Sequence, residues 1–378
     1  MRFIPYGHQS IDDDDVRSVI EVLKSDWLTT GPAVDQFELD LASYVGARHA
    51  VAVNSGTSAL DIAVQALDLP KGSEIITTPF TFAATSNAIL YNSHVPVFAD
   101  IDPATRNIHP DEIKRRITPK TRAIIYVDYA GHPCAIDEIQ EIAREHDLRL
   151  IEDACHAFGA SYKGRKIGTL ADMTIFSFHP VKPITTGEGG AVVTDDPELA
   201  ARLKLLRSHG IDRNVGDLFG EGSQWAYDMV DLGRNYRMTD IQAALGVSQL
   251  EKIDTFIKQR NRLAALYEES IGGISWLETP QCCGDVTHGW HLYTVLLNGI
   301  KRNNLYRYLH RNNVGANVHY IPTYRFTYYR KRFRFDPRAF PMTENTFDRI
   351  ITLPLYPAMT ERELEYVAET LKKAGSVL

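Results

Sequence analysis

One lysine stands where two strand-like runs of the sequence meet. The segment TIFSFHPVKPITTGEGGAVVTD, residues 174–195, contains an apolar strand, a turn with Lys182, a glycine-rich stretch and a second strand. An unpaired ammonium is costly to bury, so a surface turn is one explanation for Lys182. The alternative is a covalent bond to a ligand, because a lysine held in an imine has no ammonium to desolvate.

An acid and an imidazole follow another predicted strand. The run LRLIEDACHA, residues 148–157, ends a strand with Asp153 and places His156 three residues later. Asp153 could cap a turn, and His156 could be an ordinary core residue. A protonated pyridine nitrogen in a ligand would instead keep Asp153 ionised, and His156 could donate a hydrogen bond to the same ligand.

Hydroxyl groups and close backbone N–H groups begin a predicted helix at SGTSAL, residues 55–60, directly after the run VAVN. Such a helix N-terminus is an anion site, although Ser and Thr also cap helices for structural reasons. Ligands of open α/β sheets bind beyond the carboxyl ends of the strands. An anion site, an acid and a lysine at such ends together describe pyridoxal phosphate (PLP), which uses a lysine Schiff base and an acidic partner for its ring nitrogen.

The strands that would position these groups alternate with helical patterns. Strand-like runs occupy residues 49–54, 74–78, 95–100, 123–129, 148–154, 174–179 and 190–195. This alternation is typical of βαβ units with a mostly parallel sheet, so the predicted fold class is α/β. A long amphipathic segment, residues 239–270, would connect two domains. We expect a large ligand-binding domain at residues 1–250 and a smaller C-terminal domain at residues 251–378.

The net charge, the apolar runs and the cysteine spacing indicate which kinds of binding partner to expect. The chain of 378 residues has a net charge of −7 that is not concentrated in tails, which favours small ligands over nucleic acid or anionic membranes. The first residues hold no apolar run of signal-peptide length, and no stretch approaches about 18 apolar residues, so we expect a cytoplasmic protein. The four cysteines show no C-x-x-C spacing, which predicts reduced thiols and no metal site.

These motifs together resemble the DegT/StrS family of nucleotide-sugar aminotransferases. The segments that carry the resemblance are NSGTSAL, TPFTFAAT, IEDACHA, FSFHPVKPITTGEGG and GRNYRMTDIQAALG, in the family's order through nearly the whole chain. The resemblance implies a fold type I PLP enzyme with a mostly parallel seven-stranded sheet and a smaller C-terminal α/β domain. It also implies L-glutamate as amino donor and a homodimer with shared active sites. Relatives with histidine at the lysine position are sugar dehydratases, so Lys182 favours transamination.

The resemblance assigns roles to individual residues. Lys182 would carry the cofactor as a Schiff base, Asp153 would pair with the pyridine nitrogen, and His156 would contact the ring oxygen; these are the expected catalytic residues. Phe82 would stack on the ring, and Asn235 would reach the phosphate bound in the other subunit. The residues expected to hold the phosphate within one chain are Gly56, Thr57 and Ser177.

The segments FSFHPVK and VHYIPTYRFTYYRKRF resemble a subgroup that acts on UDP-linked 4-keto-6-deoxy-N-acetylhexosamines. The sugar contacts implied are Tyr6, Trp27, Leu28, Thr29, His319 and Tyr320. A basic cluster at residues 325–334, interleaved with tyrosines, could pair with phosphates and stack on a base, or could be a solvated basic face. GDP-linked and dTDP-linked keto sugars remain open as acceptors, and a non-catalytic PLP-binding regulator remains open as another class of function.

Overall fold

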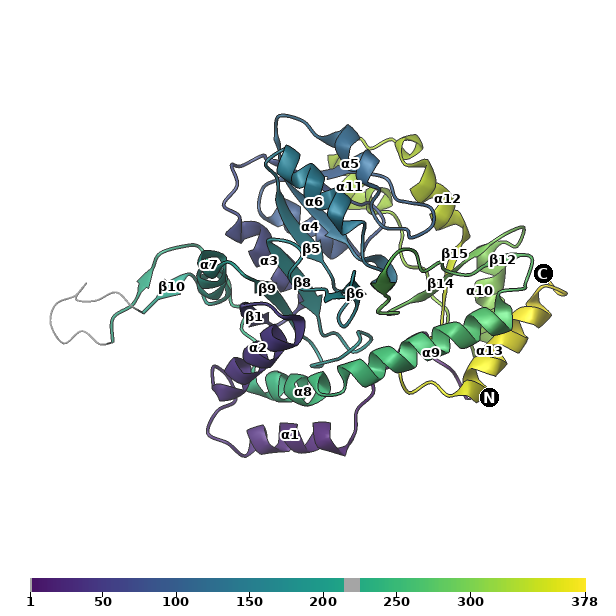
Figure 1. Ribbon diagram of the computed structural model, residues 1–378, viewed down its shortest axis with the longest axis horizontal. Coiled ribbons are helices and arrows are strands. Elements are labelled where there is room, and N and C mark those ends of the chain that lie inside the picture. The colour runs from purple at the N-terminus through teal and green to yellow at the C-terminus, as the bar shows by residue number, and fades with distance from the viewer. Residues whose placement is uncertain (1, 214–224) are drawn as a thin grey trace.

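The computed structural model describes residues 2–213 and 225–378. A seven-stranded sheet lies at its centre, with helices on both faces (Figure 1). The strand order is β1 (His49–Val53), β9 (Gly190–Thr194), β8 (Met173–Ser177), β5 (Arg149–Asp153), β4 (Thr121–Val127), β2 (Glu74–Thr77) and β3 (Val95–Phe98). Neighbouring strands are parallel except at β9, which is antiparallel to β1 and β8. The predicted α/β class and mostly parallel sheet are confirmed, and each predicted run lies on one of these strands.

Alternate side chains of each strand face opposite layers of helices. On β4, Ile124 packs in one apolar cluster and Ile125 in another. The first cluster includes residues of α2 (Pro32–Val45), α5 (Pro110–Arg116), α6 (Ile136–Glu145) and α8 (Asp240–Leu250), and the second includes residues of α3 (Gly56–Ala66), α4 (Ala83–Tyr91) and α7 (Pro197–Arg207). Burial on both faces explains why these strands read as continuous apolar runs in the sequence.

The smaller C-terminal unit is built on an antiparallel sheet. Its strands lie in the order β12 (Leu277–Glu278), β14 (Tyr293–Leu297) and β15 (Ile350–Leu353). Its apolar core includes residues of α10 (Arg302–Arg311) and α13 (Glu361–Ala374). The expected smaller α/β unit is therefore present.

The long amphipathic segment forms two helices and not one. α8 ends at Leu250, and α9 (Ile253–Ile271) begins after a short turn. Ile257 near the start of α9 packs in the core of the large sheet, whereas Tyr267 near its end packs in the core of the smaller unit. α9 thus connects the two cores, as the sequence predicted. The domain boundary between residues 250 and 251 stays a prediction.

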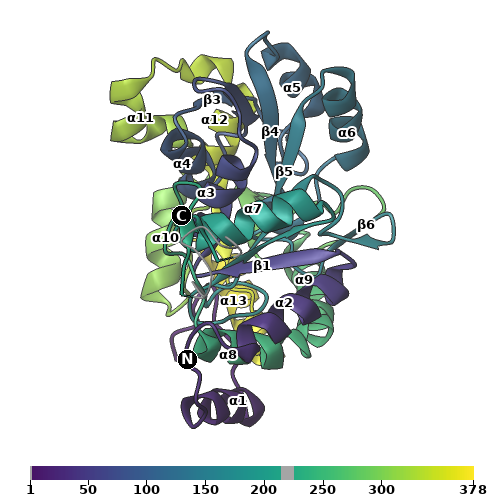
Figure 2. The same cartoon turned by 90° about the vertical axis from the view of Figure 1, so that its left-hand side faces the viewer.

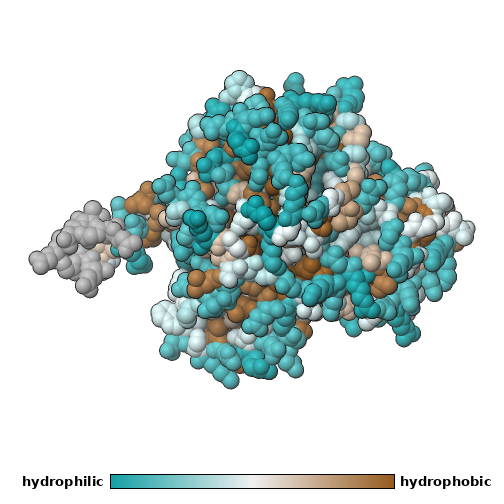
Figure 3. Space-filling view, in the orientation of Figure 1, coloured by the Kyte–Doolittle hydropathy of each residue, from teal (hydrophilic) through white to brown (hydrophobic). Residues whose placement is uncertain are grey.

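The remaining elements are short helices and ribbons. They are α1 (Asp13–Leu23), β6 (Ser161–Tyr162), β7 (Arg165–Lys166), β10 (Ile211–Asp212), β11 (Asp228–Met229), β13 (Val286–Thr287), α11 (Thr327–Arg332), α12 (Pro341–Arg349) and the 3₁₀ turns η1 (Tyr129–Gly131), η2 (Thr323–Arg325) and η3 (Pro337–Ala339). β10 and β11 pair in a ribbon that projects from the body (Figure 1), and apolar side chains are visible at the surface around its base (Figure 3). α1 lies beside α8 (Figures 1 and 2). No helix within the described ranges is long and apolar enough to cross a membrane.

Candidate active site

A cavity of about 600 Å³ lies at the carboxyl ends of the parallel strands. It is lined by residues that end or follow β1, β5 and β8, and by residues 317–321 of the C-terminal unit. The expected site residues that line it are Tyr6, Gly56, Thr57, Phe82, Asp153, His156, Ser177, Lys182, His319 and Tyr320. The structure therefore brings all three expected catalytic side chains into one cavity.

Lys182 lies in the turn that follows β8, where its backbone N–H donates to the carbonyl of His179 at 2.9 Å. Its side chain lines the cavity, so the surface-turn explanation does not describe its position. Burial lowers the pKa of the Lys182 amine, and the nearby acidic groups of Cys155 and Asp153 oppose this shift. A lowered pKa increases the fraction of unprotonated amine, which is the form that acts as nucleophile or base.

Asp153 is the last residue of β5, and its side chain is buried at the cavity wall. Its Oδ2 accepts a hydrogen bond from the hydroxyl of Thr85 at 2.7 Å, and its Oδ1 accepts one from the N–H of Cys155 at 3.3 Å. These contacts fix the orientation of the carboxylate. Thr85 lies in the segment TPFTFAAT, but no local pattern showed that it would contact an acid far along the chain.

His156 has a defined tautomer. Its Nδ1 accepts a hydrogen bond from the backbone N–H of Ala130 at 3.2 Å. Since that N–H can only donate, the ring proton of a neutral His156 is on Nε2, which lies 2.9 Å from the hydroxyl of Tyr320. Burial and the charge of Lys182 hold the pKa of His156 well below its usual range. His156 is therefore a neutral hydrogen-bond donor at the cavity wall.

The start of α3 is packed closely against the end of β8. A Cβ atom added at Gly56 would lie 2.9 Å from Cβ and 3.1 Å from Oγ of Ser177, so glycine is required at this contact. Ser55 caps the helix by accepting from the N–H of Ser58 at 3.0 Å. The first turn of a helix leaves backbone N–H groups without intrahelical partners. With the hydroxyls of Thr57 and Ser177 nearby in the lining, this corner forms a cradle for an anion.

Aromatic side chains form another part of the lining. Phe82, at the start of α4, is 61% exposed, and its ring centroid lies 6.1 Å from that of Tyr320. The ring of His319 lies 5.3 Å from that of Tyr6 and 4.9 Å from that of Tyr320. An exposed aromatic ring at the edge of a cavity is available to stack on a planar ligand.

Four expected site residues lie outside this cavity. Trp27, Leu28 and Thr29 are exposed in the segment that follows α1. Asn235 is also exposed, and its backbone bridges to Ser208 near the base of the ribbon. None of the four lines the cavity of its own chain. Within a single chain, the structure does not bring them to the site.

The basic cluster at residues 325–334 is not free to bind a nucleotide as a whole. Arg325 forms an ion pair with Glu344, which also accepts from the hydroxyl of Tyr324 at 2.6 Å. Tyr329 is buried and donates to Asn87 at 2.7 Å. The expectation that these two tyrosines stack on a base is wrong, because both pack inside the protein. The other basic side chains of the cluster are exposed and do not line the cavity, as in a solvated basic face.

A second acidic pair is buried on the opposite face of β5 from Asp153. Glu152 accepts from the hydroxyl of Thr174 at 2.8 Å, and Asp128 accepts from the N–H of Cys134 at 2.9 Å. The other carboxyl oxygen of each has no partner among the described residues. Burial raises the pKa of Asp128 well above its usual range and that of Glu152 to about 7. The fold therefore favours the protonated forms of this pair.

We expect Glu152→Gln to change how stability depends on pH. Because the pKa of Glu152 is raised in the fold, its protonated form stabilises the protein below the unfolded pKa of about 4.3, and this contribution is lost as pH rises to about 7. A glutamine can still accept from Thr174 but cannot ionise. Relative to the wild type, the variant should therefore gain up to about 3 kcal/mol of unfolding free energy between pH 5 and pH 8.

Urea unfolding at both pH values measures this difference. The exposed Glu145→Gln is the matched control and should show no pH-dependent gain. An equal gain in both variants, or none in Glu152→Gln, would contradict the buried-acid explanation.

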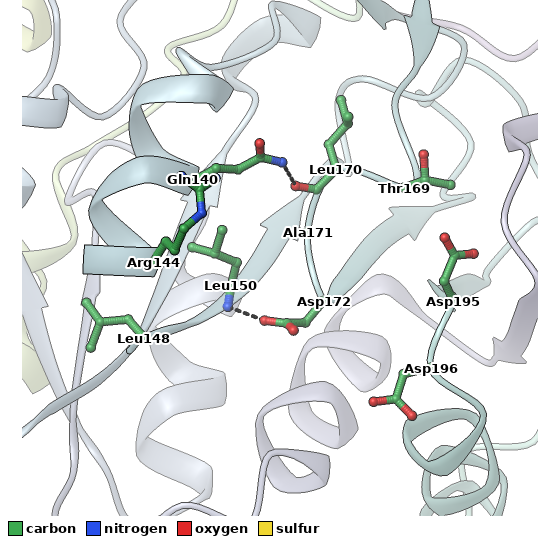
Figure 4. Close-up of a pocket in the computed structure, with 10 residues that line it drawn as sticks. All are labelled: Gln140, Arg144, Leu148, Leu150, Thr169, Leu170, Ala171, Asp172, Asp195 and Asp196. Atoms are coloured by element: carbon green, nitrogen blue, oxygen red, sulfur yellow. Dashed lines mark hydrogen bonds between the residues drawn. The ribbon is translucent and has the colours of Figure 1, made fainter. Parts of the chain in front are cut away.

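A further cavity of about 620 Å³ lies at the amino ends of β5 and β8 (Figure 4). Two of its polar side chains form hydrogen bonds to the protein backbone. Gln140 donates to the carbonyl of Leu170 at 2.7 Å, and Asp172 accepts from the N–H of Leu150 at 2.7 Å (Figure 4). No nucleophile paired with a base is found among its lining residues, so the cavity that contains Lys182 is the candidate active site.

Residues 9–372 match the model of the DegT/DnrJ/EryC1/StrS aminotransferase family. The chain belongs to this family and is an aminotransferase, as the resemblance implied. It is 38% identical to the UDP-4-amino-4,6-dideoxy-N-acetyl-β-L-altrosamine transaminase of Campylobacter jejuni, over 97% of this chain and 96% of the relative.

Two solved structures have the same fold. Helicobacter pylori PseC, described as an aminotransferase involved in the biosynthesis of pseudaminic acid, is 32% identical with a TM-score of 0.94 and covers 100% of both chains. The PLP form of Spr1654, a sugar aminotransferase by its description, from Streptococcus pneumoniae, is 30% identical with a TM-score of 0.92 over 100% of both chains. These structures confirm the fold type I architecture.

Proposed function

We propose that this protein is a PLP-dependent enzyme that transfers an amino group from L-glutamate to C4 of a nucleotide-linked 4-keto-6-deoxy sugar. The proposed acceptor is a UDP-linked 4-keto-6-deoxy-N-acetylhexosamine, which makes the protein a UDP-4-amino-4,6-dideoxy-N-acetyl-β-L-altrosamine transaminase. One observation carries the proposal: Lys182, Asp153 and the anion cradle at the start of α3 share one cavity. The Campylobacter and Helicobacter relatives support the choice of sugar. The cytoplasmic location expected from the sequence stays a prediction.

The residues of the cavity fit PLP. Lys182 would hold it covalently, and Asp153 would pair with its ring nitrogen. The corner formed by Gly56, Thr57 and Ser177 would hold its phosphate, as the close approach at Gly56 allows. Phe82 would stack on its ring. His156 would turn its Nε2 donor from the hydroxyl of Tyr320 to the ring oxygen of PLP. The solved PLP form of the Streptococcus relative supports this assignment.

When bound, PLP would supply a conjugated ring that accepts the electron pair released at the amino acid's α-carbon. Asp153, held by Thr85, would keep the ring nitrogen protonated by opposite charge. The Nζ of Lys182, whose pKa is lowered by burial, would take the proton from the α-carbon of glutamate. In the second half-reaction the same amine would deliver a proton to C4 of the sugar.

We also propose a homodimer with shared active sites. Apart from its histidines, the described lining of the cavity contains one basic side chain, that of Lys182. The expected ligands carry a phosphate, two carboxylates and a diphosphate, and a second copy is the proposed source of further positive or donor groups. The exposed Asn235 and the exposed segment 27–29 are available for that purpose.

The acceptor is tested with UDP-, dTDP- and GDP-linked 4-keto-6-deoxy sugars and L-glutamate. We expect kcat/KM for the UDP-linked N-acetyl sugar to exceed that of the others by at least about 10²-fold, because a site that hydrogen-bonds a substrate amide rejects analogues that lack it. Preference for the GDP sugar would instead indicate a GDP-perosamine synthase. Preference for a dTDP sugar without the N-acetyl group would indicate a dTDP-4-amino-4,6-dideoxyhexose transaminase. A PLP-binding regulator would keep its yellow colour when glutamate is added.

A further inference from the structure

His291 lines the cavity that contains Lys182, although it lies in the C-terminal unit, just before β14. Its side chain is buried, with 5% of the residue exposed. Its Nδ1 has no hydrogen-bond partner among the described residues. That atom is enclosed by the protein, whereas Nε2 is not enclosed and makes no hydrogen bond to a described residue. Since His291 lines the cavity, Nε2 is the nitrogen that a ligand there can reach.

The lining contains three other histidines, of which His179 is exposed and two have polar partners within the protein. His156 uses Nδ1 toward Ala130 and Nε2 toward Tyr320. His319 lies 2.8 Å from Thr352 through Nδ1, and its Nε2 is 3.3 Å from an amide of Asn317. The ring centroid of His291 lies 4.5 Å from that of His156. His291 therefore faces the same region of the cavity with an unused hydrogen-bonding group.

The backbone that presents His291 is held in place by a buried cation. One terminal nitrogen of Arg260, on α9, lies 2.9 Å from the carbonyl oxygen of Trp290, 3.5 Å from that of His291 and 3.2 Å from that of Leu355. Arg260 is 1% exposed and makes no ion pair with any described residue. Its neighbour Asn261 donates to the carbonyl of His288 at 3.0 Å. Burying the Arg260 guanidinium without an ion-pair partner costs free energy, although its hydrogen bonds hold the backbone around His291.

The segment also contains strained backbone. Trp290, directly before His291, has φ of 43°, in the left-handed region that a bulky side chain adopts at a cost. Strained backbone of this kind persists where many surrounding contacts hold it in place, and such residues are concentrated at functional sites. The strain and the buried Arg260 together keep His291 from turning away to find a partner in water.

His291 is neutral in this setting. Burial holds its pKa well below the usual range, and the charged or titratable groups that act on it, Lys182, His156, Arg260 and His319, lower it further. A neutral imidazole has one donor and one acceptor nitrogen. It can therefore donate to a carboxylate or hydroxyl oxygen and can accept from a hydroxyl.

We propose that His291 is a substrate-binding residue whose imidazole hydrogen-bonds an oxygen of the reacting substrate, and that Arg260 positions it. The oxygen belongs either to the carboxylate of the amino donor or to the sugar. This inference rests on the proposed function, which supplies both substrates.

The test uses His291→Phe, which keeps a planar ring and removes both nitrogens, and His291→Gln, which keeps a donor and an acceptor. With PLP-loaded protein, the half-reaction with L-glutamate is followed by loss of the yellow absorbance. The second half-reaction is followed by the return of the yellow absorbance when a UDP-linked 4-keto-6-deoxy-N-acetylhexosamine is added. We expect His291→Phe to raise the half-saturation concentration of one substrate about tenfold or more. His291→Gln should raise the same concentration less, because glutamine keeps a hydrogen-bonding group. The half-reaction that changes identifies the substrate.

Unfolding of the unliganded protein separates a ligand contact from a structural role. His291→Phe removes an unpartnered nitrogen and should leave the Tm unchanged or raised. The matched control is His288→Phe. That histidine is buried in the same segment and does not line the cavity, and its Nδ1 accepts from the N–H of Trp290 at 2.8 Å. The control should lower the Tm by several degrees and should not reproduce a tenfold change in half-saturation.

Two results would overturn the role of His291 alone. These are half-saturation constants equal to those of the wild type in both half-reactions, and a Tm that falls as in His288→Phe. A wild-type protein that keeps its yellow colour with glutamate would instead refute the proposed function, and with it this inference.

Discussion

Lys182→Arg should lose transamination by at least about 10³-fold while the protein stays folded. Arginine keeps a positive charge in the cavity but can neither form an imine nor exchange a proton at neutral pH, so both tasks proposed for the amine are lost. Only one lysine lines the cavity among the described residues, so no neighbouring amine can replace it. The glutamate-dependent loss of yellow absorbance, measured in a single turnover, reports this effect directly.

Chemical trapping gives an independent measurement of the same role. Borohydride reduction of PLP-loaded wild type, followed by peptide mapping, should place the pyridoxyl group on Lys182. Lys163→Arg is the control, because Lys163 is exposed and forms an ion pair with Asp137, and this variant should keep full activity. Label on Lys163 or on Lys166 would refute the assignment.

Mixing two inactive variants should restore activity if the active sites are shared. Lys182→Ala removes the amine of a chain's own site, and Asn235→Ala removes a side chain proposed to act in the other copy. In a hybrid dimer, one site then has both residues intact. Random exchange makes half of the dimers hybrid, each with one working site, so an equal mixture should reach about a quarter of wild-type activity. Steady-state rates after verified subunit exchange measure the recovery.

The reciprocal mixture is the control. The double variant Lys182→Ala/Asn235→Ala is mixed with wild type in equal amounts. Shared sites predict that every hybrid is inactive, which leaves about a quarter of wild-type activity, whereas independent sites predict about a half. No recovery in the first mixture together with half activity in the second would show that Asn235 acts within its own chain.

Local pattern was sufficient to predict the large sheet and the convergence of Lys182 and Asp153. Strands buried on both faces read as apolar runs, and parallel strands place their carboxyl ends at one edge of a sheet. A residue that directly follows such a run can therefore be placed at the carboxyl edge of the sheet from the sequence alone. The anion cradle followed from the same argument, because the start of α3 directly follows β1.

Contacts between distant segments could not be predicted in this way. No period or motif indicates that Thr85 orients Asp153, or that Arg325 pairs with Glu344 and so cannot serve a nucleotide. Nothing in the sequence around His291 showed that its side chain would line a cavity shared with the large unit.

The amino-acid sequence by itself determined the fold class, the family and the strand ends at which the chemistry is placed, because these depend on local periodicity and on short motifs. Only the tertiary structure decided which histidines of the site have polar partners within the protein, since hydrogen bonds between two separately packed units depend on how those units dock. It also decided that Asn235 and residues 27–29 are exposed outside the cavity of their own chain. An exposed side chain can act in the active site of its own chain only if it lies close to that site in space. This distance cannot be read from the position of the residue in the sequence.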